Sequence, residues 1–508
     1  MACAAQKSRS KWRWQEATAT TGAGIGPLLL GILLIAAAAF PALSPARAAA
    51  ALDLSHYRLD VAFAPDARTL TGTVAIDWRN TTGQPQEFLY FRLYPNAPHY
   101  EDGATQVSDI EIDGHEVDAS LWSDQTVLEV ELGRQVLAGD HAGVAMSFKT
   151  TVPATSNASF GILGGDEDDG WRLADWHPIL AGWEDGSGWY LDSPTRFGDP
   201  TFAESATYDL ELTAPDDYTV LGSGVTVEQE VDASTGLTTT TIETAPGRDL
   251  TLSLLPGASA GAIETTEQSI AGFTVRVSLP VDQAVPGLAG AIVDIAGETL
   301  PLYESWFGEY PERELDITTA PLVGASGVAW NGIVWLDVAA IVRDGDLSNG
   351  SLDALRFVLT HELAHQWIAG IVGSNNNDHG FMTEGLANIL AVLAIRETRG
   401  VEDAERFLRS WVADGYRNLV ESGNDGVADA PITGDSEIGA RSRLMYGKGA
   451  LGFEAIRQAI GDEAFLEGLH AYATEYRFRI SGPEDLREAF ETASGADLGM
   501  LWTFWFED

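Results

Sequence analysis

Cysteine is almost absent from this chain of 508 residues, which contains only Cys3. With one cysteine the chain cannot form an internal disulfide. Its stability must therefore come from a hydrophobic core, for which 45% hydrophobic residues provide ample material. A length of 508 residues predicts two to four domains. The lack of disulfides suits export from a bacterium better than secretion from a eukaryotic cell.

Basic residues are also scarce. The chain has 30 Lys and Arg against 75 Asp and Glu, a formal net charge of −45 at pH 7. Such a surface repels nucleic acid and anionic membranes, so we expect neither as a partner. The acidic composition by itself says little about a substrate.

Long hydrophobic runs are missing except near the N-terminus. Residues 1–48 contain a basic stretch from Lys7 to Arg13, an apolar run from Gly26 to Phe40 and a small-residue cleavage site at 46–48. This is the pattern of a signal peptide. The apolar run of about 15 residues is short for a membrane span, which needs roughly 17–25. We expect an exported protein, secreted or at the cell surface, with an uncleaved N-terminal membrane anchor as the alternative.

Residues 49–265 show the alternation of apolar and polar side chains that is typical of β-strands. Turn residues separate the alternating segments, and several short antiparallel strands in succession predict an N-terminal β domain shaped as a saddle or sandwich. The aromatic segment 171–190 is interpreted as sheet core rather than as a cleft wall. The alternating segments are 56–63, 70–78, 127–132 and 207–213.

Residues 266–508 have a different pattern, with helical spacing over most of their length. We expect the first long helix from Leu288 to Trp306, a second helix ending at Gly370 and a third from Glu384 to Gly400. These features predict a mainly helical second domain with a small sheet, and hence an α+β fold. The strands expected in this sheet are 273–279, 314–320 and 332–337.

Histidine is rare too, with 9 residues in the chain, yet two of them lie in the segment His361-Glu362-Leu363-Ala364-His365. On a helix, His361 and His365 project from one face and can reach a single metal ion. Glu384 follows on the next expected helix and supplies a third ligand. A catalytic zinc ion has three protein ligands and an open position for water, from which Glu362 can take a proton.

The alternative for this segment is a surface helix that carries two stray histidines. The flanking residues argue against it, because Phe357, Val358 and Leu359 precede the motif and Trp367 and Ile368 follow it. Buried polar groups without a partner cost roughly 2–7 kcal/mol by transfer estimates. A metal ion supplies that partner, so the segment predicts one bound Zn²⁺ and a zinc hydrolase.

Three further features carry a weaker chemical signal. The acidic loop 166–169 could bind calcium, but a solvated loop tip is the favoured interpretation. His379 lies between the two motif helices and is interpreted as a surface residue rather than a fourth ligand. Asn388, one helical turn after Glu384, is a candidate hydrogen-bond partner for a metal ligand.

The histidine motif with Glu384 resembles the gluzincins of the aminopeptidase N and leukotriene-hydrolase family. Met445-Tyr446-Gly447-Lys448-Gly449-Ala450 is similar to that family's Tyr-x-Lys-Gly segment, which carries a transition-state tyrosine. The resemblance covers nearly the whole chain after residue 48. Its other segments are 460–465, Tyr472 and 483–490 in the helical region, with 175–178 and 207–209 in the β domain.

The resemblance implies a thermolysin-like catalytic domain over residues 266–508 that hydrolyses peptide bonds. It implies that His361, His365 and Glu384 hold zinc, that Glu362 acts as general base and then general acid, and that Tyr446 binds the oxyanion. A secreted thermolysin-type endopeptidase shares these ligands, but the Tyr-x-Lys-Gly segment argues against it. A non-catalytic peptide-binding protein is disfavoured because all these residues are present.

Two departures from the family affect specificity. Its aminopeptidases carry a Gly-x-Met-Glu-Asn strand whose glutamate binds the substrate's free α-amine, and here Trp330 stands in the glutamate's place within residues 327–331. Glu184 and Glu204 are alternative acids, judged by location alone. The family's helical C-terminal domain does not follow the catalytic region, which predicts a more open cleft. The sequence thus predicts an aminopeptidase-like zinc peptidase whose preference for free amino termini is weakened or lost, and which accepts longer or blocked peptides.

Overall fold

The computed structural model describes residues 54–508 except 123, 155–156, 259–260, 284, 343–344 and 434–437. The expected signal peptide, residues 1–48, lies outside the described residues. All described residues belong to one compact unit, and the division into two domains at residue 265 remains a prediction. Among the described residues, no helix has the length and apolar character that a membrane span requires.

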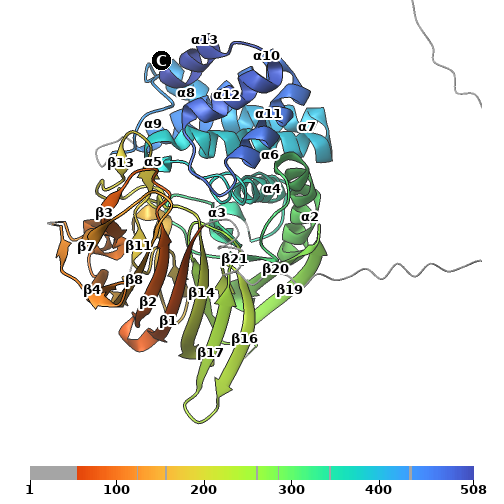
Figure 1. Ribbon diagram of the computed structural model, residues 1–508. Helices are drawn as coiled ribbons and strands as arrows, with labels where there is room; N and C mark the ends of the chain where they lie inside the picture. The colour runs from red at the N-terminus through yellow and green to blue at the C-terminus, as the bar shows by residue number, and fades with distance from the viewer. Residues whose placement is uncertain are drawn as a thin grey trace, which may run out of the picture. The chain divides into compact units, whose positions relative to one another are not determined.

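The largest sheet has eight strands, most of them antiparallel (Figure 1). In β1 the apolar residues at alternate positions are buried from Tyr57 to Phe63, as the alternation predicts. One pairing differs from the expected antiparallel arrangement, because β1 and β14 are parallel. The strand order is β16 (Val225–Asp232), β17 (Leu237–Glu243), β14 (Ala206–Pro215), β1 (Ser55–Ala64), β2 (Thr69–Arg79), β8 (His141–Thr151), β4 (Ala104–Ile112) and β5 (His115–Glu116).

One hydrophobic core joins this sheet to two four-stranded sheets. Trp171 and Trp176 are buried in that core, which confirms their interpretation as core residues, whereas Trp183 and Trp189 are half-buried in a separate hairpin. The first of these sheets has the order β15 (Tyr218–Gly222), β18 (Leu252–Pro256), β10 (Gly170–Leu173) and β9 (Leu163–Asp166). The second has the order β11 (Ile179–Leu180), β3 (Gln86–Arg92), β7 (Val127–Val136) and β6 (Ala119–Leu121). The hairpin consists of β12 (Trp183–Glu184) and β13 (Gly188–Trp189).

A fifth sheet, of five strands, follows in the chain and lies next to helix α2 (Leu288–Phe307). Its last strand, β22 (Gly327–Trp330), pairs only with β23 and therefore leaves one backbone edge open. An open edge of this kind can accept an extended peptide as an added strand. The other strands, in sheet order, are β19 (Ile263–Ile270), β20 (Phe273–Pro280), β21 (Glu314–Thr319) and β23 (Ile333–Leu336).

Helices dominate the chain after residue 337, as expected (Figure 1). Helix α6 is buried along most of its length and packs against α4 and α10, which places it at the centre of this half. The helices are α3 (Val338–Ile341), α4 (Asn349–Ala364), α5 (Asn376–His379), α6 (Glu384–Arg399), α7 (Val401–Phe407), α8 (Asp414–Glu421), α9 (Ile438–Ser442), α10 (Gly449–Ile460), α11 (Asp462–Glu475), α12 (Pro483–Ser494) and α13 (Gly499–Trp502), with π-helical segments η7 (Leu408–Ala413), η8 (Arg443–Lys448) and η9 (Thr503–Glu507).

The motif helix α4 ends earlier than the sequence predicts. Its last residue is Ala364 and His365 is its C-cap, whereas Gly370 was the expected end. Beyond the cap the chain makes tight turns, in which Ala369 has a φ of 87° and the amide of Gly370 donates to the carbonyl oxygen of His365 at 3.0 Å. A left-handed residue such as Ala369 cannot continue a right-handed helix.

Glu312 is a buried carboxyl group that links the fifth sheet region to the β domain, because the amide of Ala245 donates to its Oε1 at 3.1 Å. Burial raises its pKa from 4.5 to about 7. Below pH 4.5 the carboxyl group of Glu312 is protonated in both the folded and the unfolded chain. As pH rises from 4.5 to 7 the unfolded chain loses the proton first, so folding becomes less favourable by up to about 3 kcal/mol.

We therefore expect Glu312→Gln to be more stable than the wild type at pH 8 and close to it at pH 5. Urea unfolding at the two pH values measures this difference. Glu309→Gln, an exposed position in the same region, is the matched control and should follow the wild type. Equal stability of Glu312→Gln and wild type at pH 8 would contradict the expectation.

Candidate active site

The two helices that carry the motif are held close together. Helix α4 presents His361 on the same face as its cap residue His365, and α6 begins at Glu384. Gly385 allows α10 to approach, because a Cβ there would lie 3.0 Å from the carbonyl carbon of Gly449. Packing of α6 against both α4 and α10 thus fixes the start of α6 beside the histidines.

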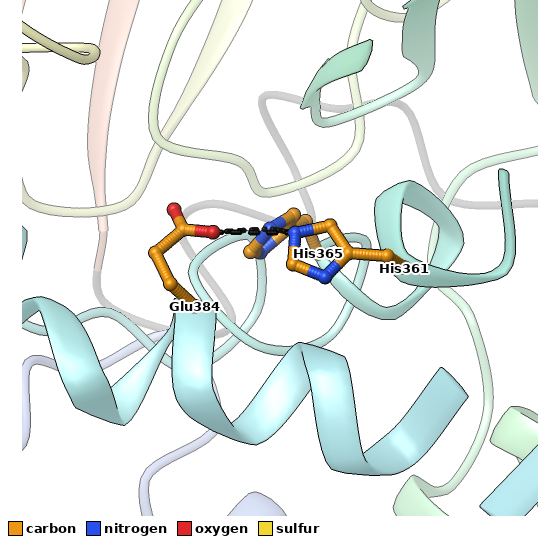
Figure 2. Close-up of side chains that lie close together, drawn as sticks. All are labelled: His361, His365 and Glu384. Carbon is orange, nitrogen blue, oxygen red and sulfur yellow. Dashed lines mark hydrogen bonds and ion pairs between the residues drawn. The ribbon is translucent and has the colours of Figure 1, made fainter. Parts of the chain in front are cut away.

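Glu384 and the two histidines converge on one point (Figure 2). Glu384 Oε2 lies 3.2 Å from His361 Nε2 and 3.4 Å from His365 Nε2, and the two Nε2 atoms are 3.1 Å apart. A tetrahedral ion with bonds of 2.0–2.2 Å separates its ligand atoms by about 3.3–3.6 Å, so this donor set and spacing fit zinc. In the part of the chain that the structure describes, this is the one group of three such side chains close enough to hold a metal.

Glu384 and His365 each favour the charged form of the other. Burial by itself would raise the pKa of Glu384, but His365 and His361 hold that pKa well below its usual range. Burial would lower the pKa of His365, but the carboxylate of Glu384 raises it to about 9. The carboxyl group of Glu384 is therefore ionised near neutral pH, which is the form that binds a cation. His365 Nδ1 faces the carbonyl oxygen of Ile368 at 3.2 Å, which orients the ring so that Nε2 points into the site.

Glu362 lies on α4 beside the edge strand β22. A Cβ at position 327 would come within 2.7 Å of Glu362 Oε1, so any larger residue there would force the carboxyl group to move. Burial raises the pKa of Glu362, and His361 and His365 partly oppose that shift. A raised pKa suits a group that takes up a proton and later releases it near neutral pH.

Tyr446 lies in the π-helical segment η8, and its ring stacks on that of His361 with centroids 6.0 Å apart. Burial raises the pKa of Tyr446, and the carboxylates of Glu384 and Glu362 raise it further, so its hydroxyl keeps a proton to donate. The prediction for Asn388 is wrong about its partner. Its amide donates to the carbonyl oxygen of Tyr446 at 3.0 Å rather than to a metal ligand.

These residues line one cleft of about 380 Å³, which also contains the open edge of β22. The cleft lining also includes Phe357, one turn before His361 on α4, and the exposed Trp411, with ring centroids 5.2 Å apart. Asp199 also lines the cleft, and sequence reasoning missed it. Its only local signal is a turn-forming Gly-Asp-Pro segment.

Trp330 is buried at the end of β22, and its side chain does not line the cleft. Its indole Nε1 donates to Asp199 Oδ2 at 2.8 Å, and its ring packs against Trp335 with centroids 4.6 Å apart. Gln366 Nε2 donates to the carbonyl oxygen of Trp330 at 3.0 Å, so this end of β22 lies beside the C-terminal end of α4. Trp330 thus packs its ring away from the cleft and hydrogen-bonds an acid from the β domain.

The remaining sequence candidates lie outside the His-His-Glu group. His379 Nδ1 pairs with Asp429 Oδ1 at 2.6 Å. Glu184 and Glu204 line a different cavity, of about 870 Å³. In the acidic loop 166–169, Oδ1 of Asp166 accepts hydrogen bonds from the backbone amides of residues 168 and 169. These bonds give the Asp166 carboxylate its partners within the loop.

Comparison with known proteins identifies the helical half of the chain. Residues 292–505 match the Peptidase family M1 domain. The chain is 28% identical over 318 residues to aminopeptidase N of Lactococcus lactis subsp. lactis, covering 59% of this chain and 36% of that protein. It is 27% identical over 321 residues to aminopeptidase M1-B of Oryza sativa subsp. japonica, covering 60% of this chain and 34% of that protein. The chain thus spans about a third of the length of these curated relatives.

The fold also has solved counterparts. The crystal structure of M1 zinc metallopeptidase from Deinococcus radiodurans has a TM-score of 0.62 and 20% identity, covering 89% of this chain and 92% of that chain. A mutant of that protein bound to Tyr-Ser-Ala substrate is equally similar, with a TM-score of 0.62. At this identity the likeness concerns the fold.

The His-His-Glu donor set lies within the residues that match the Peptidase family M1 domain, and it suits one zinc ion. Residues 292–505 match a peptidase family M1 domain, and the curated relatives and solved counterparts support a likeness to the aminopeptidase N-like family. The resemblance expected from the sequence is confirmed.

Proposed function

We propose that this protein is a zinc-dependent peptidase that hydrolyses peptide bonds. The observation that carries the proposal is one cleft that brings together His361, His365, Glu384, Glu362 and Tyr446. The relatives named above are aminopeptidases, and one solved neighbour is bound to a short peptide substrate. Peptides are therefore the substrate class that we assign to the cleft.

The chemistry follows from what each side chain can do. His361, His365 and Glu384 would hold the zinc ion, which when bound would supply polarisation of the scissile carbonyl and a lower pKa for water. Glu362 takes the proton of the attacking water and delivers it to the leaving amine. The hydroxyl of Tyr446 donates a hydrogen bond to the oxyanion, which matters most in the transition state. The open edge of β22 aligns the extended peptide.

Two parts of the proposal rest on the sequence. Residues 1–48 have the pattern of an export signal, so we propose that the protein acts outside the cytoplasm, secreted or at the cell surface. Trp330 removes the family's amine-binding glutamate from β22, which favours activity on longer or blocked peptides as well. Aminopeptidase-like and endopeptidase activity are therefore the two alternatives for one catalytic site.

A peptide library with free and acetylated N-termini tests the function. Zinc-loaded protein should cleave peptides in this library, and mass spectrometry of the products shows whether single residues or internal fragments are released. A fully folded, zinc-loaded protein that cleaves none of the peptides would overturn the proposal and favour a peptide-binding role.

Tyr446→Phe removes one hydroxyl group and leaves the stacked ring in place. We expect kcat to fall by about 10²- to 10³-fold with little change in KM, because the lost hydrogen bond forms mainly in the transition state. Steady-state kinetics on a cleaved library peptide measure both constants. Tyr416→Phe in α8 is the control, because its hydroxyl bonds Asp425 outside the cleft and its loss should leave kcat unchanged. A Tyr446→Phe protein with wild-type kcat would exclude an oxyanion role.

A further inference from the structure

The cleft has two chemically different ends. Strand β22 runs alongside α4, since Gly327 is next to Glu362 and Trp330 is hydrogen-bonded to Gln366, one turn further on. The aromatic pair Phe357 and Trp411 lies on the opposite side of Glu362 along α4, because Phe357 precedes Glu362 by five residues and Gln366 follows it. At the other end, Trp330 contacts an acid that is brought in from the β domain.

That acid, Asp199, lines two adjoining cavities. It lines the catalytic cleft, and it also lines a smaller adjoining cavity of about 80 Å³, together with His365 and Trp330. Its Oδ2 accepts from Trp330 Nε1, and its Oδ1 accepts from the amide of Thr201 at 2.8 Å. A carboxylate has about four acceptor sites. The indole of Trp330 and the amide and side chain of Thr201 use at most three of them, so at least one remains for a ligand.

The charge of Asp199 lacks a cation among the described residues. No Lys, Arg or His side chain there forms an ion pair with it, and the charged group that acts on it most strongly is the carboxylate of Glu384. Burial and this like charge both raise the pKa of Asp199. A bound cation would relieve both costs, because a buried carboxylate is stabilised by a paired positive charge.

The other acids near this region do not meet the same conditions. Glu184 and Glu204 line a different cavity, and Glu204 already accepts from Thr81 Oγ1 at 2.6 Å. Asp175 is buried and bonded to Thr201 Oγ1, and Asp249 lines only the smaller cavity. Glu362 and Glu384 belong to the catalytic group. Asp199 is therefore the acid outside that group that opens onto the catalytic cleft.

We propose that Asp199 binds the free α-ammonium group of the substrate, in place of the glutamate that Trp330 replaces. The proposal rests on the proposed peptidase function and names the part of the substrate that this end of the cleft selects. The ammonium lies at the Asp199 end, beside His365, and the chain beyond the scissile bond extends along β22 toward Phe357 and Trp411. The residue after that bond then meets an aromatic wall, which favours apolar side chains there. Trp330 keeps a specificity role, since its indole N–H holds the carboxylate in place.

Asp199→Asn tests the assignment with a matched control. The substitution keeps the shape of the side chain and one acceptor oxygen but removes the charge. We expect kcat/KM on tripeptides with a free N-terminus to fall by about 10- to 100-fold, with kcat/KM on their N-acetylated forms unchanged. Asp175→Asn makes the same change at a buried acid that shares Thr201 and does not line the cleft. It should leave the ratio of the two kcat/KM values as in the wild type.

The ratio of kcat/KM on free peptides to kcat/KM on acetylated peptides distinguishes a residue that binds the α-ammonium group from one that only supports the fold. Loss of packing would lower both kcat/KM values together and would lower the melting temperature, which is measured alongside. The wild type gives a second test that needs no variant, because it must prefer the free over the acetylated tripeptide. No preference in the wild type, or an unchanged ratio in Asp199→Asn, overturns the assignment of Asp199. Absence of cleavage of either peptide overturns the proposed function instead.

Discussion

Glu362→Gln is expected to retain one zinc ion per chain while losing about 10³-fold or more of kcat/KM on peptides. Glutamine keeps the length and one oxygen of the side chain but cannot accept a proton. Zinc is retained because Glu362 is not among the three side chains whose donor atoms converge. The loss in activity arises because the attacking water and the leaving amine both depend on one proton carrier.

Metal content by mass spectrometry and kinetics on a library peptide measure the two effects in one preparation. Asp353→Asn, on the same helix α4 but paired with Arg406 outside the cleft, is the control and should match the wild type in both. Activity of Glu362→Gln within about tenfold of the wild type would remove this residue from the mechanism. Loss of zinc in the same variant would place Glu362 among the metal-binding groups.

Glu384→Gln should abolish activity through a different route, the loss of the metal. Zinc binds ionised carboxylates and neutral imidazoles, and an amide oxygen is a much weaker ligand. The substitution also removes the charge that raises the pKa of His365 to about 9 and faces both histidines. We expect zinc affinity to fall by more than about 100-fold, the upper end of the cost of losing an outer-shell partner.

Zinc content after dialysis against a weak chelator gives the measurement. Glu397→Gln, an exposed position on the same helix α6, should keep its zinc ion and its activity. Excess zinc should restore part of the activity of Glu384→Gln, which distinguishes weakened binding from misfolding. A variant that keeps a full zinc ion through dialysis would show that Glu384 is not a ligand.

The two substitutions at Glu362 and Glu384 separate the chemical step from metal binding. Together with Tyr446→Phe they give three distinct outcomes. Glu362→Gln keeps the metal and loses the proton carrier, and Glu384→Gln loses the metal. Tyr446→Phe keeps the metal and lowers kcat alone. A non-catalytic peptide-binding protein would show none of these changes in turnover. The set therefore also decides between an enzyme and a binding protein.

Local features of the fold were predictable because side-chain periodicity reports which face of an element is buried. Strand β1 and helices α2 and α6 follow the expected segments closely. The end of α4 was not predictable, since the chain leaves the helix at His365 through contacts around Ala369, and Gly370 only looked like the stop signal. Helix ends depend on the hydrogen bonds available in the folded chain, which periodicity does not describe.

Asn388 shows the same limit within the site. Its position one turn after Glu384 suggested a bond to a metal ligand, but its amide reaches the backbone of Tyr446 on η8. Sequence spacing places a side chain on a face of a helix, and packing of a second element decides what that face meets. The contact ties the backbone of Tyr446 to helix α6.

The sequence by itself was enough to predict the His-His-Glu group, the glutamate beside it and the family resemblance, because these depend on spacing within and between two neighbouring helices. It also predicted that Trp330 stands in the place of the family's amine-binding glutamate. Only the tertiary structure decided what stands opposite that tryptophan. Trp330 and Asp199 are 131 residues apart, and their 2.8 Å contact exists because the β domain packs against the edge of the catalytic sheet. No local pattern encodes such a contact, so the specificity of this cleft is a property of the packed domains.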